Sequence, residues 1–340
     1  MAELRYAVFG TGFWSHFQIA AWNEVGGVNL VALYNRTVLK AEQVAQKFGV
    51  STVYGDPEEL LRGEQLDFMD IITEIDAHAP LVSLAARYKV PVICQKPMAP
   101  DLETAEQMVA ACREAGIPFF IHENFRWQTP IRAVKEALES EEIGAPFRAR
   151  IELISGYPVF RNQPFLKTLK QFIITDLGSH LLDVARFLFG EASRLYCQTQ
   201  QVHSDIAGED VATILLQMEG GAEVLIRMAY AENYLEHDPF PQTTMFIEGS
   251  QGSIELAPGG WLRITKKSGT LARRIISPRY SWADPDYDLV HASIVPCNAD
   301  ILKDLQGQDR AETTAEDNLK TVRLVFASYD SARSCQAVLF

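Results

Sequence analysis

Short apolar runs alternate with helical segments over the first 122 residues, and this alternation limits the possible fold more than any other feature. The apolar runs are continuous, as expected of strands that are buried on both faces of a sheet. The predicted strands cover Tyr6–Phe9, Val28–Leu33, Phe68–Ile72, Val90–Cys94 and Pro118–Ile121, and the predicted helices cover Phe17–Glu24, Leu39–Phe48, Pro57–Leu61, His78–Tyr88 and Leu102–Ala115. Such alternation predicts an α/β domain with a parallel sheet and right-handed crossovers.

The pattern changes after Pro130, where longer runs alternate apolar and polar residues and Gly220-Gly221 marks a hairpin. The predicted strands cover Arg148–Ser155, Arg194–Val202, Val211–Met218, Ala222–Ala231, Thr244–Glu248, Ser253–Leu256 and Trp261–Lys266, with helices at Ile131–Ser140, Ile174–Phe189 and Ala315–Ala332. A chain of 340 residues exceeds the roughly 250–300 residues that a single core supports. We therefore predict a second, α+β domain at residues 123–340, whose last helix could also return to pack on the first domain.

The stretch FGTGFWSH joins the first predicted strand to the first predicted helix. Gly10 permits a tight turn, and Gly12 lets the backbone approach a pyrophosphate group that the helix N-terminus attracts. Ser15 stands where a third glycine is common; it is small enough for close packing, and its hydroxyl could cap the helix. This arrangement predicts a Rossmann dinucleotide-binding domain over residues 1–122. Further candidate cofactor contacts from the same loop are Thr11, Phe13 and Trp14.

The second strand ends in Tyr34-Asn35-Arg36-Thr37. A carboxylate at this point selects NAD, whereas a basic group accommodates the 2′-phosphate of NADP. The absence of an acid favours NADP, but Asn35 could bond to a free ribose hydroxyl. Arg36 could stack on the adenine or simply be solvated. The residues therefore predict NAD or NADP as cofactor.

Lys96 follows an apolar strand directly, at the sheet edge where open α/β sheets bind their ligands. A lysine at this edge could lie near the nicotinamide end of a bound cofactor, or it could be an ordinary surface lysine in a turn. The remaining candidate cofactor-binding residues are Thr73, His78, Gln95 and Lys96 itself.

An acid, an imidazole and a second acid lie along the largely apolar helix predicted at Ile174–Phe189. Asp176, His180 and Asp183 are spaced four and three residues apart, so they share one helix face. This stripe could be a metal site, a buried structural network or a proton-transfer site. We favour proton transfer, with His180 as the acid–base group and a carboxylate that tunes or orients it.

Six stretches, taken in order along the chain, resemble the glucose–fructose oxidoreductase, inositol dehydrogenase and MocA (Gfo/Idh/MocA) family. They are FGTGFWS, ALYNRT, DIITEIDAHAPLVSLAARYKVPVICQKPMA, HENFRWQTPIRAVKEAL, DLGSHLLDVARFLFG and AEDNLKTVRLVFASYDSA. The resemblance implies a nicotinamide-dependent sugar dehydrogenase, in which a Rossmann domain precedes a domain with a large, open-faced, mostly antiparallel sheet. It places the family's lysine at Lys96, its helical acid at Asp176, its histidine at His180 and a pocket asparagine at Asn124.

The family's E-K-P motif reads Gln95-Lys96-Pro97 in this chain. Without the carboxylate, the Lys96 ammonium should be held less firmly. The resemblance also predicts a cis bond between Lys96 and Pro97. At the level of subgroups, GTGFW, LYNRT and QKP are most similar to the pentose dehydrogenases of the family, which favours NAD as cofactor.

The expected reaction is oxidation of a sugar or polyol hydroxyl. The nicotinamide takes the hydride, His180 tuned by Asp176 takes the proton, and Lys96 donates to the reacting oxygen. We expect Lys96 and His180 to converge on one cavity. The stretch before the helix supplies Arg161 and Phe165 as candidate substrate contacts, because polar donors and aromatic rings suit a polyol; a solvated surface loop is the alternative.

Two other functions stay open. One is a non-catalytic sensor that binds nucleotide and sugar. The other is a related chemistry, either transient oxidation that serves glycoside cleavage or reduction of a dihydrodiol or pyrrole. The presence of Lys96, Asp176 and His180 favours a catalyst over a sensor.

The composition limits partners and location. A net charge of −13 argues against nucleic acid and anionic membranes as partners. The five cysteines lack metal-finger spacing and suit reduced thiols, and no run reaches the roughly 18 apolar residues of a membrane span. We expect a cytoplasmic protein without a metal, which forms a homodimer or homotetramer through its second sheet.

Overall fold

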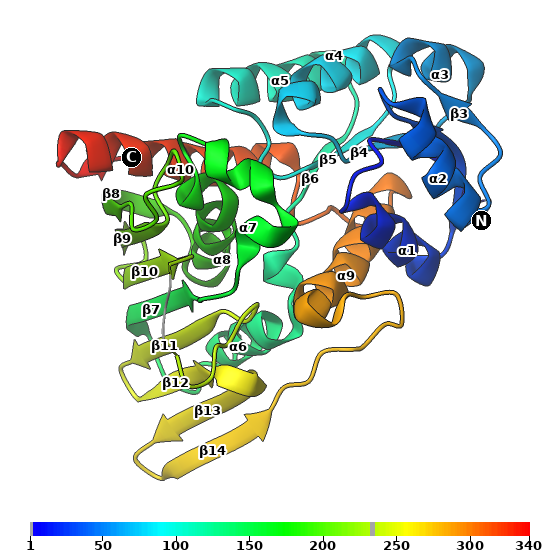
Figure 1. Cartoon of the computed structure of the whole chain (residues 1–340). Coiled ribbons are helices and arrows are strands. Elements are labelled where there is room, and N and C mark those ends of the chain that lie inside the picture. Colours follow the sequence, from blue (N-terminus) through cyan, green and yellow to red (C-terminus); the bar gives the residue numbers. More distant parts are fainter. Residues whose placement is uncertain (1–2, 232–234) are drawn as a thin grey trace. The chain divides into compact units, whose positions relative to one another are not determined.

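The chain forms two compact units in the computed structural model, which describes residues 3–231 and 235–340 and leaves aside the side chain of residue 162 (Figure 1). The first unit contains the chain up to Glu123 together with Ser281–Ala283 and Ile294–Val322. The second contains Asn124–Tyr280, Asp284–Ser293 and Arg323–Phe340. Each unit is therefore assembled from three stretches of sequence.

The first unit is built on a parallel sheet of six strands, in the order β3-β2-β1-β4-β5-β6. The strands are β1 (Leu4–Phe9), β2 (Val28–Tyr34), β3 (Val53–Tyr54), β4 (Phe68–Ile71), β5 (Val92–Gln95) and β6 (Phe119–His122). The helices between them are α1 (Ser15–Val25), α2 (Val38–Phe48), α3 (Pro57–Gly63), α4 (His78–Tyr88) and α5 (Leu102–Ala115). This is the dinucleotide-binding strand order, whose ligand crevice lies at the carboxyl ends of the strands where the order reverses, beside β1 and β4.

The five predicted strands and five predicted helices of this unit are confirmed within a few residues. The two-residue strand β3 was not predicted, because so short a segment produces no hydrophobic pattern. A helix at Asp288–Leu305 (α9) was also missed; it contains Pro296, and proline normally ends a helix.

The second unit is built on a sheet of nine strands, in the order β14-β13-β12-β11-β7-β10-β9-β8-β15. The strands are β7 (Pro146–Ile154), β8 (Ala192–Gln200), β9 (Val211–Met218), β10 (Glu223–Ala229), β11 (Thr244–Gly249), β12 (Gly252–Ala257), β13 (Trp261–Lys266), β14 (Gly269–Arg274) and β15 (Val338–Leu339). All pairs are antiparallel except β7 with β10, which confirms a mostly antiparallel sheet. The strands β14 and β15 were not predicted.

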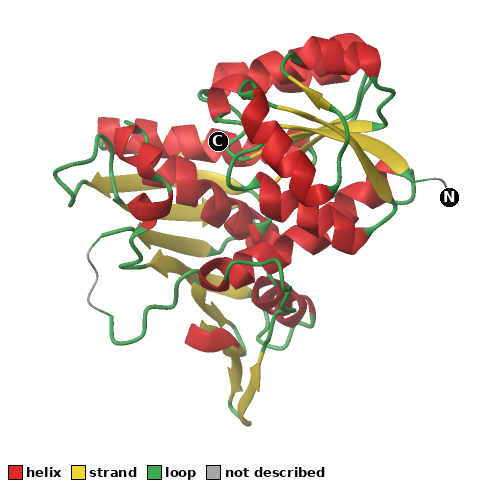
Figure 2. Cartoon of the chain, turned by 45° about the vertical axis from the view of Figure 1, so that its right-hand side comes forward, coloured by secondary structure: helices red, strands yellow, loops and turns green. Residues whose placement is uncertain are grey.

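Helices α6 (Thr129–Glu139) and α8 (Ser179–Phe189) pack against the strands of this sheet, α8 on β7 and β10 and α6 on β12 and β13 (Figure 2). The last helix, α10 (Ala315–Ser334), begins in the first unit and ends in the second. A short helix, α7 (Val159–Asn162), interrupts the stretch before α8. Among the described residues, no helix combines the length and the apolar character needed to cross a bilayer. All five cysteines are free thiols.

The helix predicted at Ile174–Phe189 is only partly correct. The α-helix begins at Ser179, and a π-helical turn at Ile174–Gly178 precedes it. Asp176 lies in this wider turn, so the α-helical spacing that placed it on one face with His180 does not hold there. Single π-helical turns are rare and occur frequently at functional sites.

Candidate functional site

The glycine loop after β1 has two glycines with different surroundings. Gly10 has φ +104°, and a Cβ on it would lie 2.5 Å from the carbonyl oxygen of Ile72. The close approach of β1 to the end of β4 therefore requires glycine at this position. A Cβ on Gly12 would meet no atom of the chain within 4 Å, so Gly12 leaves open space beside the start of α1.

Polar groups around this loop fit a dinucleotide. The Oγ1 atoms of Thr11 and Thr73 are buried and have no hydrogen-bond partner among the described residues. The backbone N–H of Thr11 donates to Asn35 Oδ1 at 3.2 Å, and Asn35 Nδ2 donates to the carbonyl oxygen of Thr37 at 2.9 Å. Buried hydroxyls that lack a partner in the protein usually bind a ligand or an ordered water. The residues that would hold the dinucleotide are thus the loop of Gly10–Gly12, Asn35 and Thr73.

Ser15 does not cap α1, although the sequence left that role open. Its Oγ donates to the carbonyl oxygen of Gly12 at 2.7 Å, and α1 has no side-chain cap. The serine is fully buried and closes the glycine loop instead.

The other candidate contacts of this loop are mostly exposed. Phe13 is 46% exposed and lies edge-on to Phe17, and Trp14 also makes an edge contact with Phe17. Arg36 is exposed at the end of β2.

His78 holds two loops of the first unit together. Its Nε2 lies 3.2 Å from the carbonyl oxygen of Thr73, and its Nδ1 lies 3.1 Å from that of Pro97 and 3.2 Å from that of Met98. The ring is almost fully buried, and burial lowers the pKa of His78, although the three carbonyl contacts oppose that shift. Both ring nitrogens thus contact backbone carbonyl oxygens. His78 therefore positions the backbone of Thr73 and of the loop after Lys96.

The bond between Lys96 and Pro97 is cis, as predicted from the resemblance. Lys96 follows β5 and is half-buried. Its neighbour Gln95 is buried and turns inward, where its Nε2 donates to Gln18 Oε1 of α1 at 3.4 Å. Gln95 therefore contributes to the interior beneath the sheet edge.

In the second unit, His180 lies near the start of α8 and is 6% exposed. Its imidazole stacks on the ring of Phe125, with the centroids 3.7 Å apart and the planes 6° from parallel. Asp176, half-buried in the π-helical turn, acts on Tyr230: burial and then the Asp176 carboxylate raise the pKa of Tyr230. Tyr230 is therefore a neutral hydroxyl that interacts electrostatically with the Asp176 carboxylate, and the sequence analysis did not identify this interaction.

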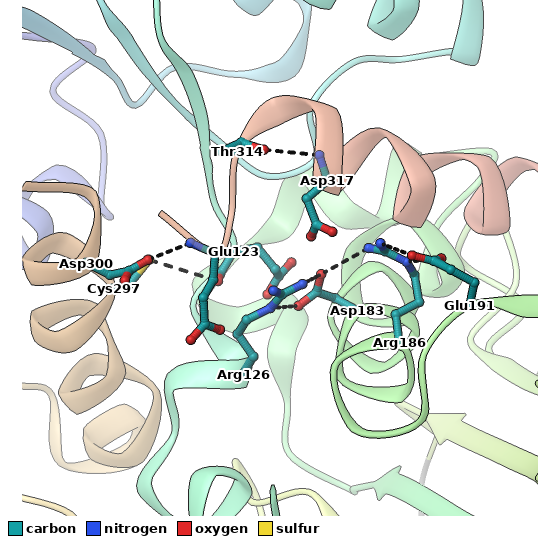
Figure 3. A network of polar contacts seen from close by, with 10 residues as sticks. Glu123, Arg126, Asp183, Arg186, Glu191, Cys297, Asp300, Thr314 and Asp317 are labelled. Carbon is teal, nitrogen blue, oxygen red and sulfur yellow. Dashed lines mark hydrogen bonds and ion pairs between the residues drawn. The ribbon is translucent and has the colours of Figure 1, made fainter. Parts of the chain in front are cut away.

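Asp183 forms a buried ion pair with Arg126 (Figure 3). Arg126 Nε donates to Asp183 Oδ2 at 2.8 Å and Arg126 NH2 donates to Oδ1 at 2.6 Å, and both side chains are at most 6% exposed. Arg186 lies 3.9 Å from Asp183 and pairs with Glu191 at 2.9 Å. The stripe on α8 therefore divides, with Asp183 in a structural network and His180 against Phe125.

The π-helical turn is held at its start by Glu209 and Tyr329. Glu209 Oε1 accepts from the backbone N–H groups of Phe172 and Ile174 at 3.2 and 3.3 Å and from the Tyr329 hydroxyl at 2.8 Å. The backbone N–H of Thr175 donates to the Tyr329 oxygen at 3.0 Å. A carboxylate and a phenol thus satisfy N–H groups that a helix start leaves without partners.

The candidate substrate residues of this unit have different settings. Asn124 is buried, and its Nδ2 donates to the carbonyl oxygen of Val290 at 3.1 Å and to Ser293 Oγ at 2.9 Å. Phe165 is 55% exposed and Arg161 is exposed. In the part of the chain that the structure describes, no three His, Cys, Asp or Glu side chains are grouped as a metal site requires.

Comparisons with known proteins identify the family of the chain. Residues 4–122 match the oxidoreductase family with an NAD-binding Rossmann fold, and residues 131–255 match the GFO/IDH/MocA C-terminal domain. The chain belongs to the Gfo/Idh/MocA family. Its first unit is an NAD-binding Rossmann domain, and the chain is an NAD(P)-dependent oxidoreductase.

Two relatives in the Gfo/Idh/MocA family match nearly the whole chain. A D-apiose dehydrogenase of Rhizobium rhizogenes is 41% identical over 99% of this chain and 98% of its own length. A D-apiose dehydrogenase of Paraburkholderia graminis is also 41% identical, over 99% of this chain and 89% of its own length. A myo-inositol 2-dehydrogenase of Thermotoga maritima is 25% identical over 64% of this chain and 66% of its own length.

Solved structures are similar over the whole chain as well, and one of them has the same 41% identity. It is an oxidoreductase from Agrobacterium radiobacter in complex with NAD+, L-tartaric acid and magnesium, with a TM-score of 0.97, 41% identity, and coverage of 99% of this chain and 98% of that one. The similarity extends over both units. It agrees with the predicted fold, a Rossmann domain followed by a domain with a large, mostly antiparallel sheet.

Proposed function

We propose that the chain oxidises a pentose by hydride transfer to NAD+, with D-apiose as the first candidate substrate. The observation that carries this proposal is the 41% identity to two D-apiose dehydrogenases over nearly the full length. The similar solved structure holds NAD+ and L-tartaric acid, a small polyhydroxylated compound, which supports NAD+ and a small hydroxylated substrate. No acid follows β2, so Asn35 in place of a carboxylate would bond to the adenosine ribose.

The proposed chemistry needs a proton acceptor and a donor to the reacting oxygen. The nicotinamide supplies the hydride acceptor when the cofactor is bound. We assign proton acceptance to His180, oriented by its stack on Phe125 and accompanied by Asp176. We assign to Lys96 the donation that stabilises the developing alkoxide. We assign Asn124, Arg161 and Phe165 to substrate binding. Asn124 would act indirectly, because its amide donates to the carbonyl oxygen of Val290 and positions that part of the backbone.

We further propose a division of labour and an assembly. Residues 1–122 bind the dinucleotide, and residues 123–340 bind the substrate and self-associate in a cytoplasmic enzyme. On the face of the nine-stranded sheet opposite α8, one cross-strand row contains Tyr196, Leu215, Leu225, Arg150 and Phe246. Aromatic, leucine and arginine side chains in one row are typical of a protein interface. We assign this row to a homodimer or homotetramer contact.

The test of the function is turnover. Purified protein with NAD+ or NADP+ and a panel of aldoses should produce reduced nicotinamide, seen by its near-ultraviolet absorbance, fastest with D-apiose and NAD+. Binding of sugar without turnover would support a sensor instead. Release of a free sugar from a glycoside with no net cofactor reduction would support the cleavage chemistry.

Substitution of His180 tests the assigned base. His180→Ala should lower kcat by about 10²–10⁴-fold, because a positioned base contributes that much, and should leave the NAD+ affinity unchanged. The exposed His237 gives a control, since His237→Ala should keep wild-type kcat. If Lys96 acts on the same step, the loss in the Lys96→Met, His180→Ala double variant should be smaller than the product of the single losses. Near-normal kcat in His180→Ala would overturn the assignment.

A further inference from the structure

Asp70 is a carboxyl group in the interior of the first unit. It interrupts the apolar strand β4 and is 0% exposed. Its Oδ2 accepts from Trp22 Nε1 at 2.9 Å and from Gln18 Nε2 at 3.2 Å, both on α1. Its Oδ1 has no partner among the described residues. An interior carboxyl that is only half satisfied reduces stability, so its presence calls for a role.

Gln18 connects this carboxyl to the residue beside Lys96. The Nε2 of Gln18 donates to Asp70, and its Oε1 accepts from Gln95 Nε2 at 3.4 Å. Gln95 is the last residue of β5, and Lys96 follows it. Two side-chain hydrogen bonds therefore lead from Asp70 to the carboxyl end of β5.

This chain of amides has a direction, because an amide donates from nitrogen and accepts at oxygen. An ionised Asp70 can only accept, so Gln18 turns its nitrogen to Asp70 and its oxygen to Gln95. Gln95 then donates its N–H to Gln18, and its side-chain oxygen is left to accept from a group outside this chain of amides. A protonated Asp70 can instead donate to the oxygen of Gln18. Both amides can then rotate by 180°, so that Gln18 donates to the oxygen of Gln95. The Gln95 nitrogen is then left to donate to a group outside this chain of amides.

The surroundings of Asp70 place its proton exchange near neutral pH. Burial raises the pKa of Asp70 to about 7, while the bonds from Trp22 and Gln18 oppose the shift. The titratable groups that face it are Tyr6 of β1 and Cys94 of β5, whose pKa values are raised first by burial and then by the Asp70 charge.

A third titratable group reaches the same network from β6. His122 Nε2 lies 3.0 Å from Asn298 Oδ1 of α9, and Gln18 Nε2 lies 3.4 Å from that same oxygen. A rotation of the Gln18 amide therefore also changes the hydrogen bonding of Asn298 and, through it, of His122.

We propose that Asp70 is a positioning residue that sets, through Gln18 and Gln95, the preference of the site for the oxidised over the reduced cofactor. Ionised Asp70 leaves the Gln95 oxygen and a nearby negative charge to favour the positively charged nicotinamide of NAD+. Protonated Asp70 removes both, which favours the neutral NADH. This inference rests on the proposed function in one respect, the placement of Lys96 and Gln95 beside the nicotinamide.

The test measures binding without any sugar, so its result is independent of the substrate proposal. Calorimetry gives the Kd values for NAD+ and for NADH at about pH 6 and about pH 8. In the wild type, the ratio of the NADH Kd to the NAD+ Kd should rise about fivefold between these pH values, as expected for one interior charge near the ring. In Asp70→Asn, the ratio should stay constant.

Three further variants separate this role from a merely structural one. Gln18→Met keeps the carboxyl and its charge but breaks the amide chain, so the rise in the ratio should become clearly smaller than in the wild type. Trp22→Phe removes a donor that favours the ionised carboxyl, so the pH-dependent rise in the ratio (the step) should move to higher pH. Asp67→Asn changes an exposed carboxyl just before the same strand and should keep the wild-type step. A wild-type step in Asp70→Asn or in Gln18→Met overturns the proposal; if Asp70→Asn does not fold, Gln18→Met and Trp22→Phe decide.

Discussion

At the scale of single residues, the two glycines of the first loop illustrate how a motif combines separate requirements. Gly10 is required by the chain itself, through its positive φ and the Ile72 carbonyl oxygen 2.5 Å from any Cβ. Gly12 is required by nothing in the chain within 4 Å. The sequence motif predicted both, but only the structure separates a folding requirement from the space left for a ligand.

This difference predicts opposite effects of alanine at the two positions. Gly10→Ala should lower the free energy of unfolding by about 2–4 kcal/mol, because it combines left-handed strain with a backbone clash. Gly12→Ala should leave unfolding unchanged within about 0.5 kcal/mol and should weaken NAD+ binding by about tenfold or more. Chemical denaturation and calorimetry check the two expectations. A Gly12→Ala protein that binds NAD+ normally would contradict the assignment of its open space to the cofactor.

Asp70 also predicts a dependence of stability on pH. Its pKa in the folded state is about 7, raised from 3.8 by burial, so the folded state keeps a proton that the unfolded state has lost in this range. The free energy of unfolding should therefore fall as the pH rises from about 4 to about 7, by on the order of 4 kcal/mol from this group. Asp70→Asn should remove that part of the slope. Urea unfolding across this range measures it, and a slope equal to that of the wild type would refute the raised pKa.

At the scale of elements, the π-helical turn before α8 shows what a spacing argument omits. The apolar positions predicted a single helix and gave no sign that it widens at Asp176. The contacts at its start come from far away in sequence, because Glu209 and Tyr329 accept hydrogen bonds from N–H groups there. Such long-range contacts leave no periodic pattern in the segment that they shape.

These contacts predict that the turn depends on Glu209 and Tyr329. Glu209→Gln removes the charge that accepts two N–H groups and a hydroxyl, and should lower stability by about 1–3 kcal/mol. Because the turn carries Asp176, kcat should fall more than the NAD+ affinity changes. Tyr329→Phe should act in the same direction but more weakly. Equal kcat in Glu209→Gln and wild type would show that the turn does not need this anchor.

The sequence predicted those parts of the site that belong to contiguous motifs, and it did not predict contacts between residues far apart in the chain. Lys96, His180 and the glycine loop belong to contiguous motifs and were identified as candidates. The pairing of Arg126 with Asp183 and the stacking of Phe125 on His180 join residues more than fifty positions apart, and no motif encodes them. Asp70 did carry a signal, a lone acid within FMDII, which the analysis did not use.

At the scale of the whole molecule, the proposed self-association through the second sheet can be tested at one position. Leu215 is 37% exposed in the row that contains Tyr196 and Leu225. Leu215→Glu places a charge in that row and should lower the mass seen by light scattering after size exclusion, because a buried unpaired charge opposes association. Leu39→Glu, at a 63% exposed leucine of α2, should leave the mass unchanged. The same mass for both variants and wild type would place any assembly elsewhere.

Helices α9 and α10 each begin in one compact unit and end in the other. The nucleotide-binding unit consequently takes Asn298 and the Thr314 bridge to Phe120 from sequence almost two hundred positions downstream. Cutting the gene after Glu123 would yield a polypeptide that lacks these partners. A chimera that takes its nucleotide-binding unit from another family member must therefore exchange three separate segments together, because a single crossover after Glu123 would separate that unit from its own partners.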